Sequence, residues 1–170
     1  MKPFLISGMP RCRTAWLTAV LNAHGILTYH DVILHRRDVK SDEYGVCDPT
    51  LALMFPRQTL AHYAGSPIIR LYADDLNERF DALDAWSHKP LTMKMRRIYR
   101  TNYAWFAYNT PDVGIHVNEL EDDDVVGEII TTCTRGEVTP SREIISIFQL
   151  LKIEEHVKKA LKLKKLNEAK

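Results

Sequence analysis

The N-terminal end of the chain alternates an apolar run with a segment of helical periodicity. Residues 2–6 form a short apolar run that ends in Ser7-Gly8-Met9-Pro10, a pattern that favours a buried strand leading into a turn. From Thr14 the apolar residues recur at spacings of three and four, and Gly25 follows as a C-terminal stop signal. These apolar positions are Trp16, Leu17, Val20 and Leu21. The pattern therefore predicts a strand, a turn and a helix in succession.

The same alternation continues along the chain. Residues 26–30, 66–71 and 112–117 are predicted as further short strands, whereas residues 31–65 are hard to assign beyond a short helix within 49–63. Helices are predicted from Asp74-Asp75 to Trp86, over 91–108, from 122 to about 133, from Thr139-Pro140-Ser141, and over about 152–166 with a frayed tail. Residues 1–170 are thus expected to form one three-layer α/β domain of the P-loop type, with about four or five short, mostly parallel strands flanked by helices.

The composition says more about where the protein works than about which reaction it catalyses. The formal net charge is +1, so an anion site has to be built locally, and nucleic-acid binding is not expected. The N-terminus lacks the layout of a secretory signal, and apolar stretches are too short for a membrane span. The three cysteines form no CxxC pair, which favours a reducing compartment and argues against a cysteine metal site. We therefore expect a cytoplasmic protein without membrane contact.

The turn between the first strand and helix is the most informative segment. Backbone N–H groups at a helix start favour an anion, and Arg11 and Arg13 add guanidinium groups that can grip phosphate or sulfate oxygens. Thr14 adds a hydroxyl donor. The Walker A pattern fails, because counting from Gly8 places Arg13, Thr14 and Ala15 where its second glycine, lysine and Ser/Thr would stand. The spacing predicts a phosphate-binding loop without the ordinary ATPase or kinase lysine.

Pro10-Arg11-Cys12-Arg13-Thr14-Ala15-Trp16 resembles the sulfotransferase family, whose first strand is followed by Pro-[Lys/Arg]-Ser-Gly-Thr-Thr-Trp. Small phage-encoded sulfotransferase-like proteins are closer still. The resemblance implies a donor, 3′-phosphoadenosine-5′-phosphosulfate (PAPS), and no metal. It also implies that Arg11 contacts the sulfuryl-bearing 5′-phosphate, that the N–H groups from Cys12 to Trp16 cradle it, and that Trp16 packs near the nucleotide base. The other reading of the loop is a plain helix start with two solvated arginines and a core tryptophan.

The family holds the 3′-phosphate with an arginine that ends a later strand and a serine eight residues on. Arg70 ends the predicted strand 66–70, but Glu78 stands in place of the serine. Arg70 could equally be a strand-end residue paired with Asp74 or Asp75. The resemblance also extends to residues 113–120 and to Arg135-Gly136, for which a helix C-cap is the favoured interpretation.

Sulfuryl transfer to a hydroxyl needs a base near the acceptor oxygen. Because ligands gather at the carboxyl ends of parallel strands, His30 and Asp31 would lie near the loop if the first two strands were neighbours. Asp31 is the first choice for the catalytic base and His30 the second, against a plain polar pair closing a loop. Asp48 is a weaker candidate for lining the acceptor pocket.

The leading hypothesis is an enzyme that moves a sulfuryl group from PAPS to an unknown hydroxyl or amine acceptor. Arg11 would stabilise charge on the transferred group. The first alternative is an inactive P-loop-fold module that binds partner proteins, for example as a phage–host factor acting in the host cytoplasm. The second is a nucleotide kinase or phosphohydrolase, disfavoured by the absent lysine. The sequence leaves the acceptor and the oligomeric state open.

Overall fold

The structure, a computed structural model, describes residues 3–30, 45–86, 90–110 and 113–151. Five strands form one sheet in the order β2-β3-β1-β4-β5, and every neighbouring pair is parallel. The strands are β1 (Leu5–Gly8), β2 (Thr28–His30), β3 (Gly45–Cys47), β4 (Ile68–Tyr72) and β5 (Gly114–His116). Parallel strands need crossover connections, and helices supply them on both faces of the sheet.

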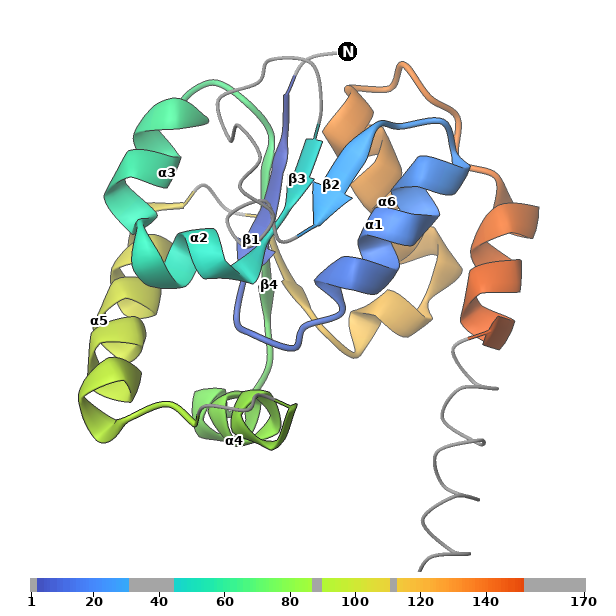
Figure 1. The fold of residues 1–170 in the computed structure, drawn as a ribbon. Coiled ribbons are helices and arrows are strands. Elements are labelled where there is room, and N and C mark those ends of the chain that lie inside the picture. Colours follow the sequence, from blue (N-terminus) through green and yellow to red (C-terminus); the bar gives the residue numbers. More distant parts are fainter. Residues whose placement is uncertain (1–2, 31–44, 87–89, 111–112, 152–170) are drawn as a thin grey trace, which may run out of the picture.

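The helices complete three layers (Figure 1). One side of the sheet carries α2, α3 and α5, and the other carries α1, α6 and the helical residues 142–151. Their bounds are α1 (Thr14–Ala23), α2 (Pro49–Met54), α3 (Pro56–His62), α4 (Leu76–Trp86), α5 (Met93–Asn109), the 3₁₀ turn η1 (Glu119–Glu121) and α6 (Asp123–Thr134). The predicted fold class, an α/β domain of the P-loop type with a flanked parallel sheet, is confirmed: its first strand runs through a tight loop into a helix.

The central strand, β1, contributes side chains to the core on both faces of the sheet. Leu5 packs in the cluster that includes Val46, whereas its neighbours Phe4 and Ile6 belong to the cluster on the other face. Successive side chains of a strand point to opposite faces, so a strand covered on both sides has to be apolar throughout. Each of these fully buried side chains contributes about 1.5–3 kcal/mol relative to exposure.

The largest departure from the sequence prediction is β3. It inserts between β1 and β2, pairing Leu5 with Val46 on one side and Val46 with Tyr29 on the other. The condition under which His30 and Asp31 were placed near the loop, that the first two strands are neighbours, is therefore not met. A three-residue strand carries little local signal, and β3 is stabilised by its two partners rather than by its own propensity.

The remaining elements follow the prediction closely. The short helix expected within 49–63 is two helices, because Pro56 cannot continue the ladder of α2 and starts α3 instead. Asp122 caps α6 by accepting a hydrogen bond from the Asp124 N–H at 2.8 Å. The predicted helix over 152–166 lies outside the described residues. Within those residues, no helix has the length and apolar character needed to cross a bilayer.

Candidate phosphate-binding site

The predicted loop leaves β1 at Gly8 in close contact with β4. A Cβ added at Gly8 would lie 2.0 Å from the Leu71 carbonyl oxygen, so only glycine allows the two strands to pair here. The next residue strengthens the contact: the Met9 N–H donates to the Leu71 carbonyl at 3.1 Å, and the Met9 sulfur accepts from the Ala73 N–H at 3.3 Å. These contacts fix where the loop begins at the carboxyl edge of the sheet.

Two arginines shape the turn itself. Arg11 and Arg13 both have positive φ values, 60° and 62°, a left-handed conformation that costs a side-chain-bearing residue about 1–2 kcal/mol. Arg13 stands where the sulfotransferase pattern has glycine, the residue for which this conformation is free of strain. Backbone strain of this kind persists where the surrounding structure holds it, often at ligand sites.

The first turn of α1 lacks an internal partner for its backbone donors. Arg13 is the N-cap residue but makes no capping hydrogen bond, and no acidic residue lies in the first turn. Within the described part of the chain, the N–H groups of Arg13, Thr14 and Ala15 make no hydrogen bond to a protein acceptor. Ala15 is exposed, whereas Arg13 is half-buried and Thr14 is buried. A helix start in this condition favours an anion.

The Arg13 guanidinium is only partly neutralised. Its Nη2 pairs with Glu121 Oε1 at 3.0 Å, while the Glu121 side chain is 63% exposed. The other terminal nitrogen, Nη1, is buried and has no hydrogen-bond partner among the described residues. A buried donor left unpaired is costly, and an anion oxygen at the loop would satisfy it.

His30 comes close to the loop although β2 is not next to β1. Helix α1 crosses back over the sheet toward β2, and the Thr14 hydroxyl lies 2.9 Å from His30 Nε2. Thr14 is buried and His30 half-buried. The structure thus brings together the predicted donor Thr14 and the predicted base His30. Asp31, the first choice for the base, lies outside the described residues.

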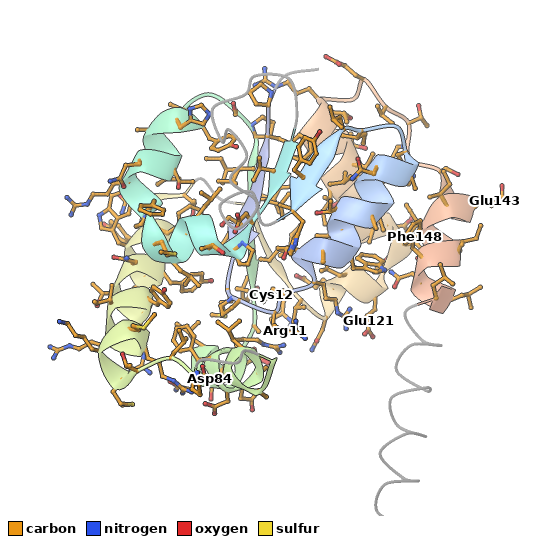
Figure 2. The ribbon with its side chains drawn as sticks, in the orientation of Figure 1. Arg11, Cys12, Asp84, Glu121, Glu143 and Phe148 are labelled. Carbon is orange, nitrogen blue, oxygen red and sulfur yellow. The ribbon has the colours of Figure 1, made fainter. Side chains whose placement is uncertain are left out.

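The other predicted loop residues serve the fold through their side chains. The Cys12 side chain is fully buried, and burial raises the pKa of its thiol to about 11, so any contact with a ligand falls to its backbone. The Trp16 indole N–H donates to the Phe148 carbonyl at 3.2 Å, which joins α1 to the helical residues 142–151 (Figure 2). A role for Trp16 beside a nucleotide base stays a prediction.

Arg70 lies away from the end of its strand. Its Nη1 donates to the Ala107 carbonyl of α5 at 2.5 Å, and its Nη2 would lie 2.8 Å from a Cβ built at Gly114. It forms no ion pair with Asp74 or Asp75 within the described residues, so that alternative is wrong. A 3′-phosphate role for Arg70 stays a prediction and would require the guanidinium to leave Ala107.

Asp48, the weaker candidate for lining the acceptor pocket, makes contacts within the fold. Asp48 is fully buried directly after β3; its Oδ1 caps α2 by accepting from the Thr50 N–H at 2.7 Å, and its carbonyl accepts from the Ser7 hydroxyl at 2.5 Å. The Asp-Pro pair at 48–49 is a helix-start signal that could have located this end of β3.

Comparisons with known proteins leave the family open. No protein-family model matches the chain, and no curated protein matches it in sequence. Among solved structures, it is similar to a gluconokinase from Sinorhizobium meliloti 1021 with 11% sequence identity and a TM-score of 0.39, covering 90% of this chain and 97% of that chain. A similarity at that level decides nothing about this protein's reaction. Within the described residues, no group of three His, Cys, Asp or Glu side chains is placed to hold a metal ion.

Proposed function

We propose that this protein is a sulfotransferase-like enzyme that transfers a sulfuryl group from PAPS to a hydroxyl or amine acceptor. The observation that carries the proposal is the loop from Gly8 to Trp16. It contains backbone N–H groups at Arg13, Thr14 and Ala15 that have no protein acceptor among the described residues, and Arg11 and Arg13 belong to the same turn. The loop lacks the lysine that a nucleoside triphosphate would need.

The orphaned donors of the loop fit an anionic group. Arg13 Nη1 is buried without a partner, and the three N–H groups have no protein acceptor within the described residues. Arg11 is exposed at the tip of the turn, where a guanidinium fork can bind two oxygens of one phosphate or sulfate. Together they would stabilise the negative charge that develops as the bond between sulfur and the 5′-phosphate oxygen breaks.

The proposed reaction forms a bond from the acceptor oxygen or nitrogen to sulfur and releases adenosine 3′,5′-bisphosphate. The acceptor proton has to move to a base. His30 is a candidate because it sits one hydrogen bond from Thr14, at the loop's helix. Its Nε2 and the Thr14 hydroxyl orient each other, so Thr14 would position the imidazole. Asp31, the first choice on sequence grounds, lies outside the described residues and stays a candidate.

Isothermal titration calorimetry with adenosine 3′,5′-bisphosphate tests the proposal. The unmodified protein should bind, and Arg11→Ala should lose at least about tenfold in affinity, the value of a charge-assisted hydrogen bond. Arg142→Ala is the matched control, because this exposed arginine pairs with Asp124 on another helix and should leave binding unchanged.

Two other outcomes would redirect the assignment. Absence of heat at roughly millimolar ligand would contradict the enzyme and favour an interaction module without a nucleotide. A magnesium-dependent gain in affinity for ATP over the bisphosphate would instead favour a nucleotide kinase.

A further inference from the structure

The layer formed by α2, α3 and α5 has an uneven distribution of charge. The whole chain is nearly balanced, with 23 Lys and Arg residues against 22 Asp and Glu residues. The three helices of this layer, however, contain no Asp or Glu. Their Lys and Arg residues are Arg57, Lys94, Arg96, Arg97 and Arg100. The positive charge on this side of the sheet (Figure 1) is therefore not balanced by carboxylates of its own helices.

A groove lies beside α5 on this layer. Its volume is about 260 Å³, and it is lined by Arg97, Ile98, Thr101 and Asn102. Asn102 connects the groove to α2, because its side-chain amide donates a hydrogen bond to the Leu53 carbonyl at 2.7 Å. The groove therefore lies where the middle of α5 meets the end of α2.

Exposed apolar side chains accompany this groove. Met54 and Phe55 follow Leu53 at the junction of α2 and α3 and are 42% and 41% exposed, and Ile98 within the groove is 47% exposed. Two turns farther along α5, the Trp105 ring lies 5.3 Å from the Arg57 guanidinium. Aromatic residues, Met and Arg are the side chains enriched in the cores of protein interfaces. The composition of this surface is therefore typical of a contact with another protein.

The cations around the groove differ in whether they have a counter-charge. Arg96 pairs with Asp84 of α4. Arg57, Lys94 and Arg97 are exposed, and none of them forms an ion pair with a residue that the structure describes. Lys94 and Ile98 are four residues apart in α5 and so share one face of the helix. A ligand that matches this surface combines apolar groups with negative charge.

We propose that this surface docks an acidic amphipathic segment of a partner protein. Apolar side chains of the segment would enter the groove, and its carboxylates would pair with the exposed cations, which is a recurring mode of peptide recognition. This docking surface consists of Met54, Phe55, Arg57, Lys94, Arg97 and Ile98. It shares no residue with the phosphate loop, so the inference does not rest on the proposed function.

The apolar part of the docking surface favours a protein segment over single-stranded nucleic acid. Nucleic acid is held by phosphate contacts together with bases stacked on aromatic rings. Here the Arg57 guanidinium already lies over the Trp105 ring, and the groove itself offers the aliphatic side chain of Ile98. An aliphatic groove provides no stacking platform but accommodates a Leu, Ile or Phe side chain of a peptide.

Selection of peptides from a random library on the full chain, followed by fluorescence anisotropy of the enriched peptides, tests the proposal. The enriched peptides should combine Asp or Glu with large apolar residues. Ile98→Ser should lower their affinity about tenfold. Arg97→Gln should lower it about threefold at low salt, with a smaller effect at high salt because the charge is exposed.

Matched controls come from the opposite layer. Leu150→Ser changes an apolar side chain that is 63% exposed, and Arg142→Gln changes an exposed arginine. Both should leave peptide affinity unchanged. All four substitutions are at exposed positions, so the melting temperatures should stay close to that of the unmodified protein, and a loss of binding then reports on the surface rather than on folding.

Several results would overturn the proposal. A selection that enriches no peptide, or enriches peptides without acidic residues, contradicts the charge argument. Enriched peptides that bind the Ile98→Ser and unmodified proteins equally well contradict the position of the site. Tighter binding of oligothymidylate or of phosphatidylserine vesicles than of any enriched peptide, abolished by Ile98→Ser, would assign the surface to nucleic acid or to a membrane. A dimer that dissociates in Ile98→Ser would assign it to a second copy of the chain.

Discussion

Helices α1 and α6 pack into the same core on one face of the sheet, yet their first turns are satisfied in opposite ways. Helix α6 starts with an acidic cap: Asp122 accepts from the Asp124 N–H, and Asp123 and Asp124 add negative charge in the first turn. Helix α1 starts with Arg13, which makes no capping hydrogen bond, and it has no acidic residue in its first turn.

The contrast shows that a helix N-terminus needs hydrogen-bond acceptors and negative charge, and that the two helices differ in where these come from. An N-terminal turn has unpaired donors and a partial positive charge, each of which favours an anion. Helix α6 contains its own anions and needs nothing further. Helix α1 adds positive charge to a positive end, through Arg11 and Arg13, and in the proposed function a bound ligand supplies the anion. The following changes test that difference, from the largest expected effect to the smallest.

Gly8→Ala should have the largest effect, because it removes the support of the α1 loop. The new Cβ would lie 2.0 Å from the Leu71 carbonyl oxygen, and β1 and β4 would have to separate. We expect the free energy of unfolding to fall by about 3 kcal/mol, as measured by urea denaturation. Gly127→Ala within α6 is the control: its nearest atoms, on Pro140, are at 3.6 Å, and stability should rise by up to about 1 kcal/mol. Equal losses in both variants would contradict the close approach at Gly8.

Arg13→Gly should separate binding from folding at the α1 end. Glycine relieves the left-handed conformation but removes the Glu121 ion pair, so stability should stay within about 1 kcal/mol of the unmodified protein. Affinity for adenosine 3′,5′-bisphosphate should fall about tenfold, because the guanidinium is lost. The matched change is Arg135→Gly at the C-cap of α6, where Arg135 also has a positive φ, 53°, and donates to the Gly65 carbonyl. If Arg135→Gly lowered the affinity for the nucleotide as much as Arg13→Gly, the result would contradict a specific role of the loop in binding.

Asp122→Ala, at the start of α6, should lower stability and leave nucleotide affinity unchanged, the opposite of the effect expected for Arg13→Gly. Removing an N-cap carboxylate costs about 1 kcal/mol of stability, measurable by thermal or urea unfolding. Nucleotide affinity should not change, because Asp122 supplies an anion only to its own helix. A loss of affinity comparable to that of Arg13→Gly would show that the two helix starts are not independent.

A smaller effect is expected at Asp84, which ties α4 to α5 through Arg96. The Leu91 N–H holds the pKa of this carboxyl below its ordinary value of 3.8, and Arg96 adds to the shift. Because the pKa in the folded state is depressed, the stabilisation is present above the unfolded value and is lost as pH falls through the folded one. The melting temperature of Asp84→Asn should therefore lie below that of the unmodified protein at neutral pH, and the gap should close in acid. A difference in melting temperature that widens as the pH falls would contradict this prediction.

The sequence predicted the fold class because the strands and helices repeat distinct periodicities. The helix starts at Thr14 and Asp123 and the helix end near Gly136 were also predictable, since caps and stop signals are local. The strand β3 was not, because Gly45 is buried against the Phe4 ring and has no local pattern. Its insertion between β1 and β2 depends on tertiary packing, so the sequence could not decide whether those two strands are neighbours.

The candidate site likewise contains some features that the sequence could predict and others that it could not. Arg11, Arg13 and Thr14 could be predicted, because one contiguous motif contains them. The sequence placed His30 near the loop only if the first two strands were neighbours; the contact with Thr14 arises instead from α1 crossing the sheet.

The most direct measurement is a titration of the ¹⁵N-labelled protein with adenosine 3′,5′-bisphosphate, followed by the backbone amide resonances. The account predicts that the N–H signals of Arg13, Thr14 and Ala15 shift most, while those of Asp123 and Asp124 at the start of α6 remain in place. Unmoved loop amides at saturating ligand, or shifts at α6 as large as those at α1, would contradict the claim that the first helix is built to receive an external anion.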